Sequence, residues 1–465
     1  MPALGRSFGF LWSSTALSNV ADGVLKVGAP LLAVSMTRSP TLVSLVGAAA
    51  TVPWLLFALH AGAIADRTDR RRIMIVANVV RTAILATATL MAAFGLLDLW
   101  GLLAAVLAAG VTEVFADTSA QSILPMTVPA DHLTRANGRL STAQMIGNDF
   151  LGAPLAGLMV AVLPAVIFGA PALLYGAAGA LLLGIRGTYR STPATRRGPD
   201  HADPGQTPIH QGRPDDRQGP DGSLTGQRSS GERGRPGLHP AGSEVRRRPL
   251  RKDIGEALRF LWSHTFLRRL AISAGMLNLA NSAYFAVFVL WAVGDGSRMG
   301  MEPSEYGLMT TSFAVGAVLG SLVSGRVAGV FGEFRTLRAA WLASSVLLLV
   351  PVFVPSPWAL YATAVAWGLF GAGGNVLVIS ARQRLIPPDL LGRVNSAYRL
   401  VGMGGMPLGA ALGGVIAEFA GIQPVLIGAT GVCLAAVGQV WRARTDQISE
   451  PLTREPTLSD ISGSR

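Results

Sequence analysis

Long apolar segments recur along nearly the whole chain and are separated by short polar connections. A helix that crosses a membrane needs about 20 predominantly apolar residues. Twelve stretches of roughly that length are present, at about residues 8–35, 41–63, 73–95, 99–118, 138–162, 165–186, 270–293, 305–328, 336–354, 358–380, 396–419 and 422–441. The pattern therefore predicts an all-α membrane protein with twelve transmembrane helices.

The composition supports this prediction. Only 14% of the 465 residues are charged, whereas a soluble protein carries roughly a quarter. The first apolar stretch has no clear cleavage site after it, so we expect it to be retained as a helix in the bilayer.

Positive charge is unequally divided between the two sets of connections. One set carries most of the arginines, including those at 67–72, whereas the other carries little beyond Arg38 and Arg298. Because arginine-rich loops stay in the cytoplasm, we expect a multi-pass protein of the cell membrane with both termini cytoplasmic.

Two sequence motifs divide the chain into related halves. The connection after the second apolar stretch reads GAIADRTDRRR over residues 62–72. The pattern P-x-D-x-L-x-R-x-N occurs after the fourth stretch, from Pro129 to Asn137, and again after the tenth, from Pro387 to Asn395. This repetition predicts two six-helix halves in the same orientation.

The spacing of Gly62, Asp66, Arg67, Arg70 and Arg71 resembles the G-x-x-x-D-R-x-x-R-[RK] signature of the major facilitator superfamily. The motif has Asp69 at a position where many members have glycine, and this variant resembles the branch that exports drugs, macrolides and siderophores. The resemblance implies that these residues form a cytoplasmic gate, in which Asp66 caps a helix of the other half and Arg70 pairs with Asp117. A basic loop that only sets the topology is the alternative.

The region between the halves differs in composition. It is rich in Pro, Gly, Ser and Arg and has few aliphatic side chains, so it cannot bury enough surface to fold by itself. It lacks the aromatic residues that stack on bases, so its positive charge favours lipid headgroups over nucleic acid. An amphipathic helix at the membrane surface is expected after it. We accordingly divide the chain into an N-terminal half (1–186), a disordered basic linker (187–252), an interfacial helix (253–266), a C-terminal half (267–441) and a cytoplasmic tail (442–465).

Charged residues inside the apolar stretches are costly in lipid and are therefore expected to face a cavity. Asp22 lies near the middle of the first stretch, with Asn19 one turn before it and Lys26 one turn after it. Asp22 and Lys26 can pair at this spacing, which leaves two interpretations. Asp22 binds protons or a cationic substrate, or the pair is only structural.

Other charged residues are candidates on the same grounds. Glu113 and Asp117 lie one turn apart in the fourth stretch, and Asp149 lies in the fifth. Cavity-facing roles and simple solvation at a helix end both remain open for the first two. Arg81, in the third stretch, is expected to extend to the cytoplasmic surface and is not proposed as a site residue.

Polar and aromatic residues in the seventh and tenth stretches are the candidates for lining the cavity, because the resemblance places these helices around it. Hydrogen bonding between helices is the alternative role. These candidates are Asn278, Ser282, Tyr284, Trp367 and Asn375.

The remaining observations bear on energy coupling. The chain has only two lysines, and neither stands in the Gly-Lys-[Ser/Thr] sequence of a phosphate-binding loop. No metal-ligand spacing or catalytic nucleophile is evident, so neither an enzyme nor a cofactor or metal is expected. The resemblance to drug/proton antiporters is incomplete in two places. Such proteins often have an arginine in the fourth helix, and this chain has none there. They usually have adjacent Gly and Pro in the fifth helix, whereas here Ala153 separates Gly152 from Pro154.

We therefore expect a monomeric secondary transporter that exports an amphiphilic small molecule by proton antiport. A uniporter or importer of a metabolite, and a membrane scaffold or sensor that does not transport, are the alternatives.

Overall fold

The computed structural model describes residues 5–129, 132–163, 165–187, 189, 259–386 and 391–441, apart from some individual side chains within them. The predicted linker and tail lie outside the described residues, except for residues 187 and 189. So does most of the predicted interfacial helix, of which residues 259–263 are helical before a bend at His264.

The structure confirms the all-α fold and the twelve predicted spans. In the described residues, twelve helices are long and apolar enough to cross a membrane. The N-terminal half contains α1 (Arg6–Met36), α2 (Pro40–Arg67), α3 (Arg70–Ala93), α4 (Leu99–Ile123), the short 3-10 helix η1 (Leu124–Met126), α5 (Leu133–Met145), η3 (Ile146–Gly152), α6 (Ala153–Val162) and α7 (Val166–Leu183). The C-terminal half contains α9 (Thr265–Ala292), α10 (Pro303–Phe331), α11 (Glu333–Leu347), α12 (Val350–Phe353), α13 (Pro357–Leu385), α14 (Leu391–Ala420) and α15 (Ile422–Trp441).

Local sequence explains several helix ends. Ser39 and Asp69 cap α2 and α3 by accepting hydrogen bonds from backbone N–H groups of the first turn. The fifth span is interrupted, because α5 continues through the π-helical segment η3 into α6. Single π-helical turns widen a helix locally and are frequent at functional sites.

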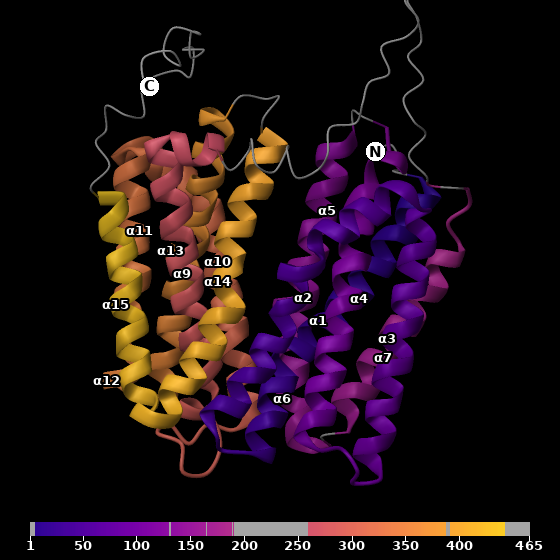
Figure 1. Cartoon of the computed structure of the whole chain (residues 1–465), viewed down its shortest axis with the longest axis horizontal. Helices are drawn as coiled ribbons and strands as arrows, with labels where there is room; N and C mark the ends of the chain where they lie inside the picture. Colours follow the sequence, from indigo (N-terminus) through magenta and orange to yellow (C-terminus); the bar gives the residue numbers. More distant parts are fainter. Residues whose placement is uncertain are drawn as a thin grey trace, which may run out of the picture. The chain divides into compact units, whose positions relative to one another are not determined.

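The two halves form two bundles, drawn in indigo to magenta and in orange to yellow in Figure 1. They contact each other mainly where α2 packs against α14 and where α6 packs against α10. Small residues allow the second contact, since a Cβ at Gly307 would meet the Ala153 carbonyl and the Pro154 backbone.

The buried core differs between the two ends of the bundles. One apolar cluster contains residues of both halves, such as Leu31 of α1 and Tyr306 of α10. Near the arginine-rich loops each half has its own cluster, around Met74 in the N-terminal half and around Trp341 in the C-terminal half. The halves therefore share a core away from the arginine-rich end and have separate cores near it.

Hydrogen bonds between the halves lie at the end where the core is shared. Arg38 donates to the carbonyl oxygens of Val293 (3.1 Å) and Asp295 (3.0 Å). The Glu418 carboxylate accepts from the Ser39 hydroxyl (2.6 Å) and from the Thr41 backbone N–H (3.1 Å). We call these contacts the inter-half seam.

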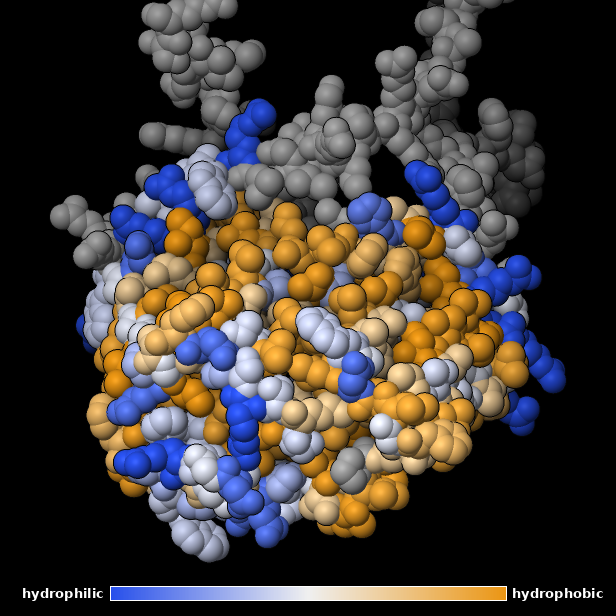
Figure 2. All heavy atoms as spheres, turned by 60° about the horizontal axis from the view of Figure 1, so that its bottom comes forward, coloured by the Kyte–Doolittle hydropathy of each residue, from blue (hydrophilic) through white to orange (hydrophobic). Residues whose placement is uncertain are grey.

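Hydrophobic residues cover much of the face shown in Figure 2, and hydrophilic residues gather at its lower left and along its edges. Many large apolar side chains are exposed, among them Leu173 on α7, Val330 on α10 and Phe419 on α14. Such a surface would be unfavourable in water and is expected for a protein surrounded by lipid.

Candidate functional site

The centre of the N-terminal half holds a buried charged cluster around Asp22 of α1. The Tyr175 hydroxyl on α7 donates to Asp22 Oδ1 at 2.6 Å. The Arg81 guanidinium on α3 lies 3.6 Å from the same oxygen and 4.6 Å from the centre of the Tyr175 ring. Three helices thus place an acid, a cation and a phenol together in the interior of the bundle.

The expectation that Arg81 extends to the surface was wrong. Its side chain is only 1% exposed, and its Nε donates to the Thr112 hydroxyl at 3.2 Å. Arg81 lies eleven residues after the start of α3, about 16 Å along the axis, which is too far for its side chain to reach the end of the helix. It shares a buried face with Met74, Asn78 and Leu85, and this spacing was the sequence signal for an inward arginine.

Lys26 pairs with a different acid from the one predicted. Its Nζ lies 3.7 Å from Glu113 Oε1 of α4. No ion pair between Lys26 and Asp22 is found among the described side chains. The reason is that Asp22 already lies against Arg81 and Tyr175, so Lys26, one turn further on, reaches across to α4 instead.

Asp117 lines a cavity together with Asp22, Lys26 and Glu113. The predicted Asp117–Arg70 pair is not found among the described side chains. Arg70 is the first residue of α3. Its Nη1 contacts the Met126 sulfur at 3.0 Å, and its backbone N–H donates to the Tyr189 carbonyl at 3.3 Å.

The other predicted gate residues lie in the last turns of α2 and the first turn of α3. Arg71 donates to the carbonyl oxygens of Leu182 (2.9 Å) and Leu183 (3.0 Å) at the end of α7. Arg67 is exposed, and a Cβ at Gly62 would meet no atom within 4 Å. The side chain of Asp66 lies outside the described part of the structure.

We call the space beside Asp22, Lys26, Glu113 and Asp117 the charged cavity; its volume is about 490 Å³. It is bordered mainly by α1, α2, α4 and α7, and Arg399 on α14 borders it from the other half. Asn19 does not border it, because its amide donates to the Thr15 carbonyl (2.7 Å) within α1.

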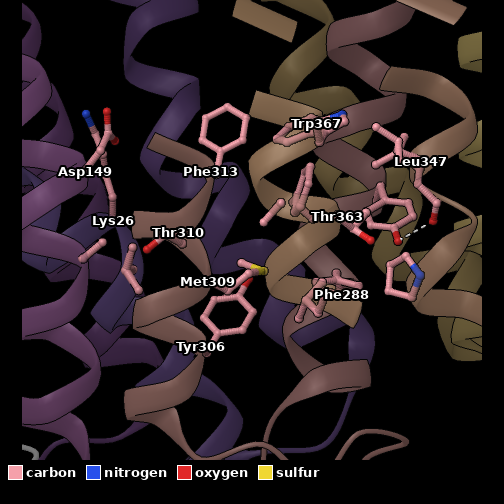
Figure 3. Close-up of a pocket in the computed structure, with 18 of the residues that line it drawn as sticks. Lys26, Asp149, Phe288, Tyr306, Met309, Thr310, Phe313, Leu347, Thr363 and Trp367 are labelled. Atoms are coloured by element: carbon pink, nitrogen blue, oxygen red, sulfur yellow. Dashed lines mark hydrogen bonds between the residues drawn. The ribbon is translucent and has the colours of Figure 1, made fainter. Parts of the chain in front are cut away.

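A second, apolar space of about 280 Å³ adjoins the charged cavity, and Lys26 borders both. We call it the aromatic pocket. Its walls in the C-terminal half include Tyr284, Phe288, Tyr306, Phe313 and Trp367. Figure 3 shows Lys26 and Asp149 on the side of the N-terminal helices and the labelled aromatic side chains on the other.

The predicted cavity residues of the C-terminal half therefore have different positions. Tyr284 and Trp367 line the aromatic pocket. Asn278 instead donates to the Gly402 carbonyl at 3.1 Å, which joins α9 to α14. Asn375 is exposed, and neither it nor Ser282 lines either cavity. The sequence interpretation had missed Phe288, Tyr306 and Phe313, because an aromatic residue in an apolar helix usually faces lipid or core.

These features define a class of protein: a multi-pass membrane protein whose two helical halves enclose polar and apolar cavities at their interface. Such a site can hold a small molecule, and buried charges that face a cavity are characteristic of transport pathways.

Comparison with known proteins identifies the family. The model of the family Transmembrane secretion effector matches residues 2–196, and that of the Major Facilitator Superfamily matches residues 270–461. The chain belongs to the major facilitator superfamily, a family of membrane transporters and not of enzymes.

Individual relatives are distant. The enterobactin exporter EntS of Citrobacter koseri is 27% identical over 208 residues, which are 43% of this chain and 46% of that protein. Macrolide efflux protein A of Streptococcus pyogenes is 24% identical over 136 residues, which are 29% of this chain and 34% of that protein. The matches thus span less than half of these relatives.

The similarity of folds extends further. The crystal structure of a bacterial homologue of the iron transporter ferroportin, in an inward-facing state, superposes with a TM-score of 0.67 at 14% identity. It covers 97% of this chain and 100% of that chain. This likeness supports the shared fold across both halves.

Proposed function

We propose that this protein is a secondary active transporter that exports an amphiphilic small molecule of the drug, macrolide or siderophore type in exchange for protons. The export direction is supported by the relatives, which are named as exporters of enterobactin and of macrolides. A small-molecule substrate agrees with the size of the charged cavity, about 490 Å³, because ligand sites commonly measure ~300–1,000 Å³.

The balance of charge around the charged cavity carries the proposal of proton coupling. Three carboxylates, Asp22, Glu113 and Asp117, face two cations of the same half, Lys26 and Arg81. An uncompensated charge is costly inside a membrane protein. One bound proton or one bound cation would neutralise the excess negative charge.

The proton is assigned to Asp117. Asp22 lies between Tyr175 and Arg81, and Glu113 pairs with Lys26, so each already has a partner that stabilises its negative charge. Asp117 forms no ion pair among the described side chains. Arg399 borders the same cavity but is exposed and lies near Met403, where solvent screens its charge. Asp22, to which the sequence interpretation gave the proton, becomes the fixed part of the cluster.

Alternating access is the proposed mechanism, with the arginine-rich end in the cytoplasm. In this conformation the halves hold separate cores at that end and share the seam at the other. Transport would require the seam to open and the arginine-rich end to close. Asp66, in the last turn of α2, and Arg70, the first residue of α3, are proposed to form the cytoplasmic gate without Asp117.

Flux measurements in liposomes test the function. The purified full chain is reconstituted, a pH gradient is imposed, and the movement of a macrolide and of enterobactin is followed. Transport of either one is expected to accelerate at least ~10-fold with the gradient, since one proton crossing two pH units contributes about 2.7 kcal/mol.

Asp117→Asn should abolish the acceleration while leaving exchange of labelled for unlabelled substrate intact, because asparagine cannot release a proton. Asp295→Asn, an exposed change outside both cavities, is the matched control. Flux that is unaffected by the gradient would identify a uniporter, and no flux of any tested amphiphile would favour the scaffold or sensor role; either result contradicts the proposal.

A further inference from the structure

The aromatic pocket contains five rings from three helices of the C-terminal half that contact one another. Trp367 of α13 lies 4.9 Å from Phe285 and 4.6 Å from Phe313, measured between ring centres. Tyr284 and Phe288 stack at 5.3 Å with an interplanar angle of 23°. All five side chains border the pocket, so aromatic faces and edges form much of its wall.

The size of the pocket limits what can enter. Its volume of about 280 Å³ is slightly below the ~300–1,000 Å³ typical for whole drug-sized ligands. The pocket therefore suits one flat apolar part of a ligand, while the remainder extends past Lys26 into the charged cavity.

The wall opposite the rings carries two charged residues, Lys26 and Asp149. Lys26 is already paired with Glu113 on the side of the charged cavity. Asp149 forms no ion pair among the described side chains. Lys26 offsets part of the charge of Asp149 from a distance, but its ammonium group is held by Glu113, so the Asp149 carboxylate is left without a directly contacting cation in the described structure.

The π-helical segment η3 fixes the position of Asp149. A Cβ at Gly23 of α1 would overlap the Asn148 backbone, so α1 and η3 are in direct backbone contact. On the other side, the Thr311 hydroxyl of α10 lies 3.5 Å from the Asp149 carbonyl oxygen. Asp149 is therefore held between the two halves, at the mouth of the aromatic pocket.

We propose that the aromatic pocket and Asp149 bind an arylalkylamine, which is an alkylamine attached to an aromatic ring, in its protonated form. The carboxylate would pair with the ammonium group, and the flat ring system would lie among the five side chains. Aromatic faces also attract cations, so both walls favour a positive charge next to a ring. The assignment rests on the proposed transport function only in taking this bound amine as the transported molecule.

Binding of three probes of one skeleton tests the proposal: naphthylmethylamine, naphthylmethanol and naphthoate, which are cationic, neutral and anionic at pH 7.5. Affinities for the purified full chain in detergent are measured by calorimetry at that pH, without a membrane or a gradient. The amine is expected to bind at least ~10-fold more tightly than the alcohol, because its ammonium group forms a charge-assisted hydrogen bond with Asp149. Naphthoate should bind most weakly, because its carboxylate is repelled by that of Asp149.

Two variants assign the contacts. Asp149→Asn should bring the affinity for the amine down to that for the alcohol, whereas Asp149→Glu should keep the preference for the amine. Trp367→Ala should lower the affinity for the amine and for the alcohol alike by about tenfold, because it removes stacking area and no charge. Trp358→Ala, which changes a tryptophan that is 82% exposed and lies outside the pocket, should leave all affinities unchanged.

The outcomes separate this proposal from the proposed function. Naphthoate binding as tightly as the amine, or an unchanged preference for the amine in Asp149→Asn, would overturn the assignment of a cationic ligand. Affinities that are unaffected by Trp367→Ala would overturn the assignment of the pocket. Transport without proton coupling would contradict the proposed function and leave these binding results intact.

Discussion

The two halves of this protein share a fold but divide the chemistry of its interior between them. In the N-terminal half, Asp22, Lys26, Arg81, Glu113 and Asp117 lie around the charged cavity. The C-terminal half contributes aromatic rings to its pocket and, of the charged residues, only the exposed Arg399 to the charged cavity. Under the proposed function, ion coupling and the recognition of apolar groups therefore lie on opposite walls of one interface.

The halves also differ in the buried charges that join their helices. Ion pairs and hydrogen bonds of charged side chains join α1, α3, α4 and α7 in the N-terminal half. Glycines bring backbones into direct contact in both halves: a Cβ at Gly23 of α1 would overlap the η3 backbone, and one at Gly316 of α10 would overlap the α13 backbone. Substitutions of the charged residues and of the glycines should therefore destabilise the protein for different reasons.

The largest effect on stability is expected for Arg81→Leu. The change leaves the Asp22 carboxylate buried without its cation, and breaking such a pair costs roughly 3–5 kcal/mol. Thermal unfolding of the purified protein in detergent, followed by tryptophan fluorescence, measures the loss.

The double variant Arg81→Leu with Asp22→Asn should recover much of that stability, because both charges are then absent. Arg335→Leu, at an exposed position on α11, is the control and should change stability little. If Arg81→Leu alone unfolded at the same temperature as the wild type, the buried charged cluster would have no structural role.

A smaller loss is expected for Gly316→Ala in the C-terminal half. The added methyl group would overlap the Val365 backbone and force α10 and α13 apart, and such overpacking costs about 1–3 kcal/mol. The same unfolding measurement detects it.

Gly325→Ala on the same helix provides the matched control. A Cβ there would meet no atom within 4 Å, so the higher helix propensity of alanine should leave stability unchanged or raise it by up to ~1 kcal/mol. Equal effects of the two substitutions would contradict the close packing of α10 and α13.

The smallest effect is expected at the inter-half seam, for Glu418→Ala. The change removes two hydrogen bonds between α14 and the start of α2, and both are exposed, so water competes for the same donors and acceptor. Distances between spin labels at Met36 and Arg298, in a variant with Cys433→Ser, should show a larger population with the seam open.

Glu333→Ala is the control for this experiment. Glu333 pairs with Arg384 within the C-terminal half, so its loss should not change the distances across the seam. A distribution unchanged by Glu418→Ala would show that these hydrogen bonds do not stabilise the closed seam.

The spans were predictable from sequence because each is set by a local property, namely a run of apolar residues of sufficient length. All twelve were found, and Asp22, Lys26, Glu113 and Asp117 do border one cavity. The partners of these residues were not predictable, because pairing depends on how helices far apart in sequence face each other. Helical spacing alone could not indicate that Lys26 would reach Glu113 on α4.

Arg81 and the aromatic pocket also depend on how helices far apart in sequence face each other, which the sequence does not reveal. A single arginine in an apolar helix fits either a surface position or a buried ion pair, and only the positions of Asp22 and Tyr175 decide between them. The pocket arises where α9, α10 and α13 meet, so Tyr306 and Phe313 gain their role from tertiary packing.

Around the charged cavity, three carboxylates of the N-terminal half face two cations of that half, and we propose that Asp117 binds the compensating proton. Infrared difference spectroscopy of the purified protein between acidic and alkaline pH measures this directly, because a protonated carboxyl group has its own carbonyl stretching band. We expect one component of this band to titrate with pH in the wild type, to be missing from the difference spectrum of Asp117→Asn and to be kept in the control Asp295→Asn. A band that persists in Asp117→Asn and disappears in Asp22→Asn would contradict it.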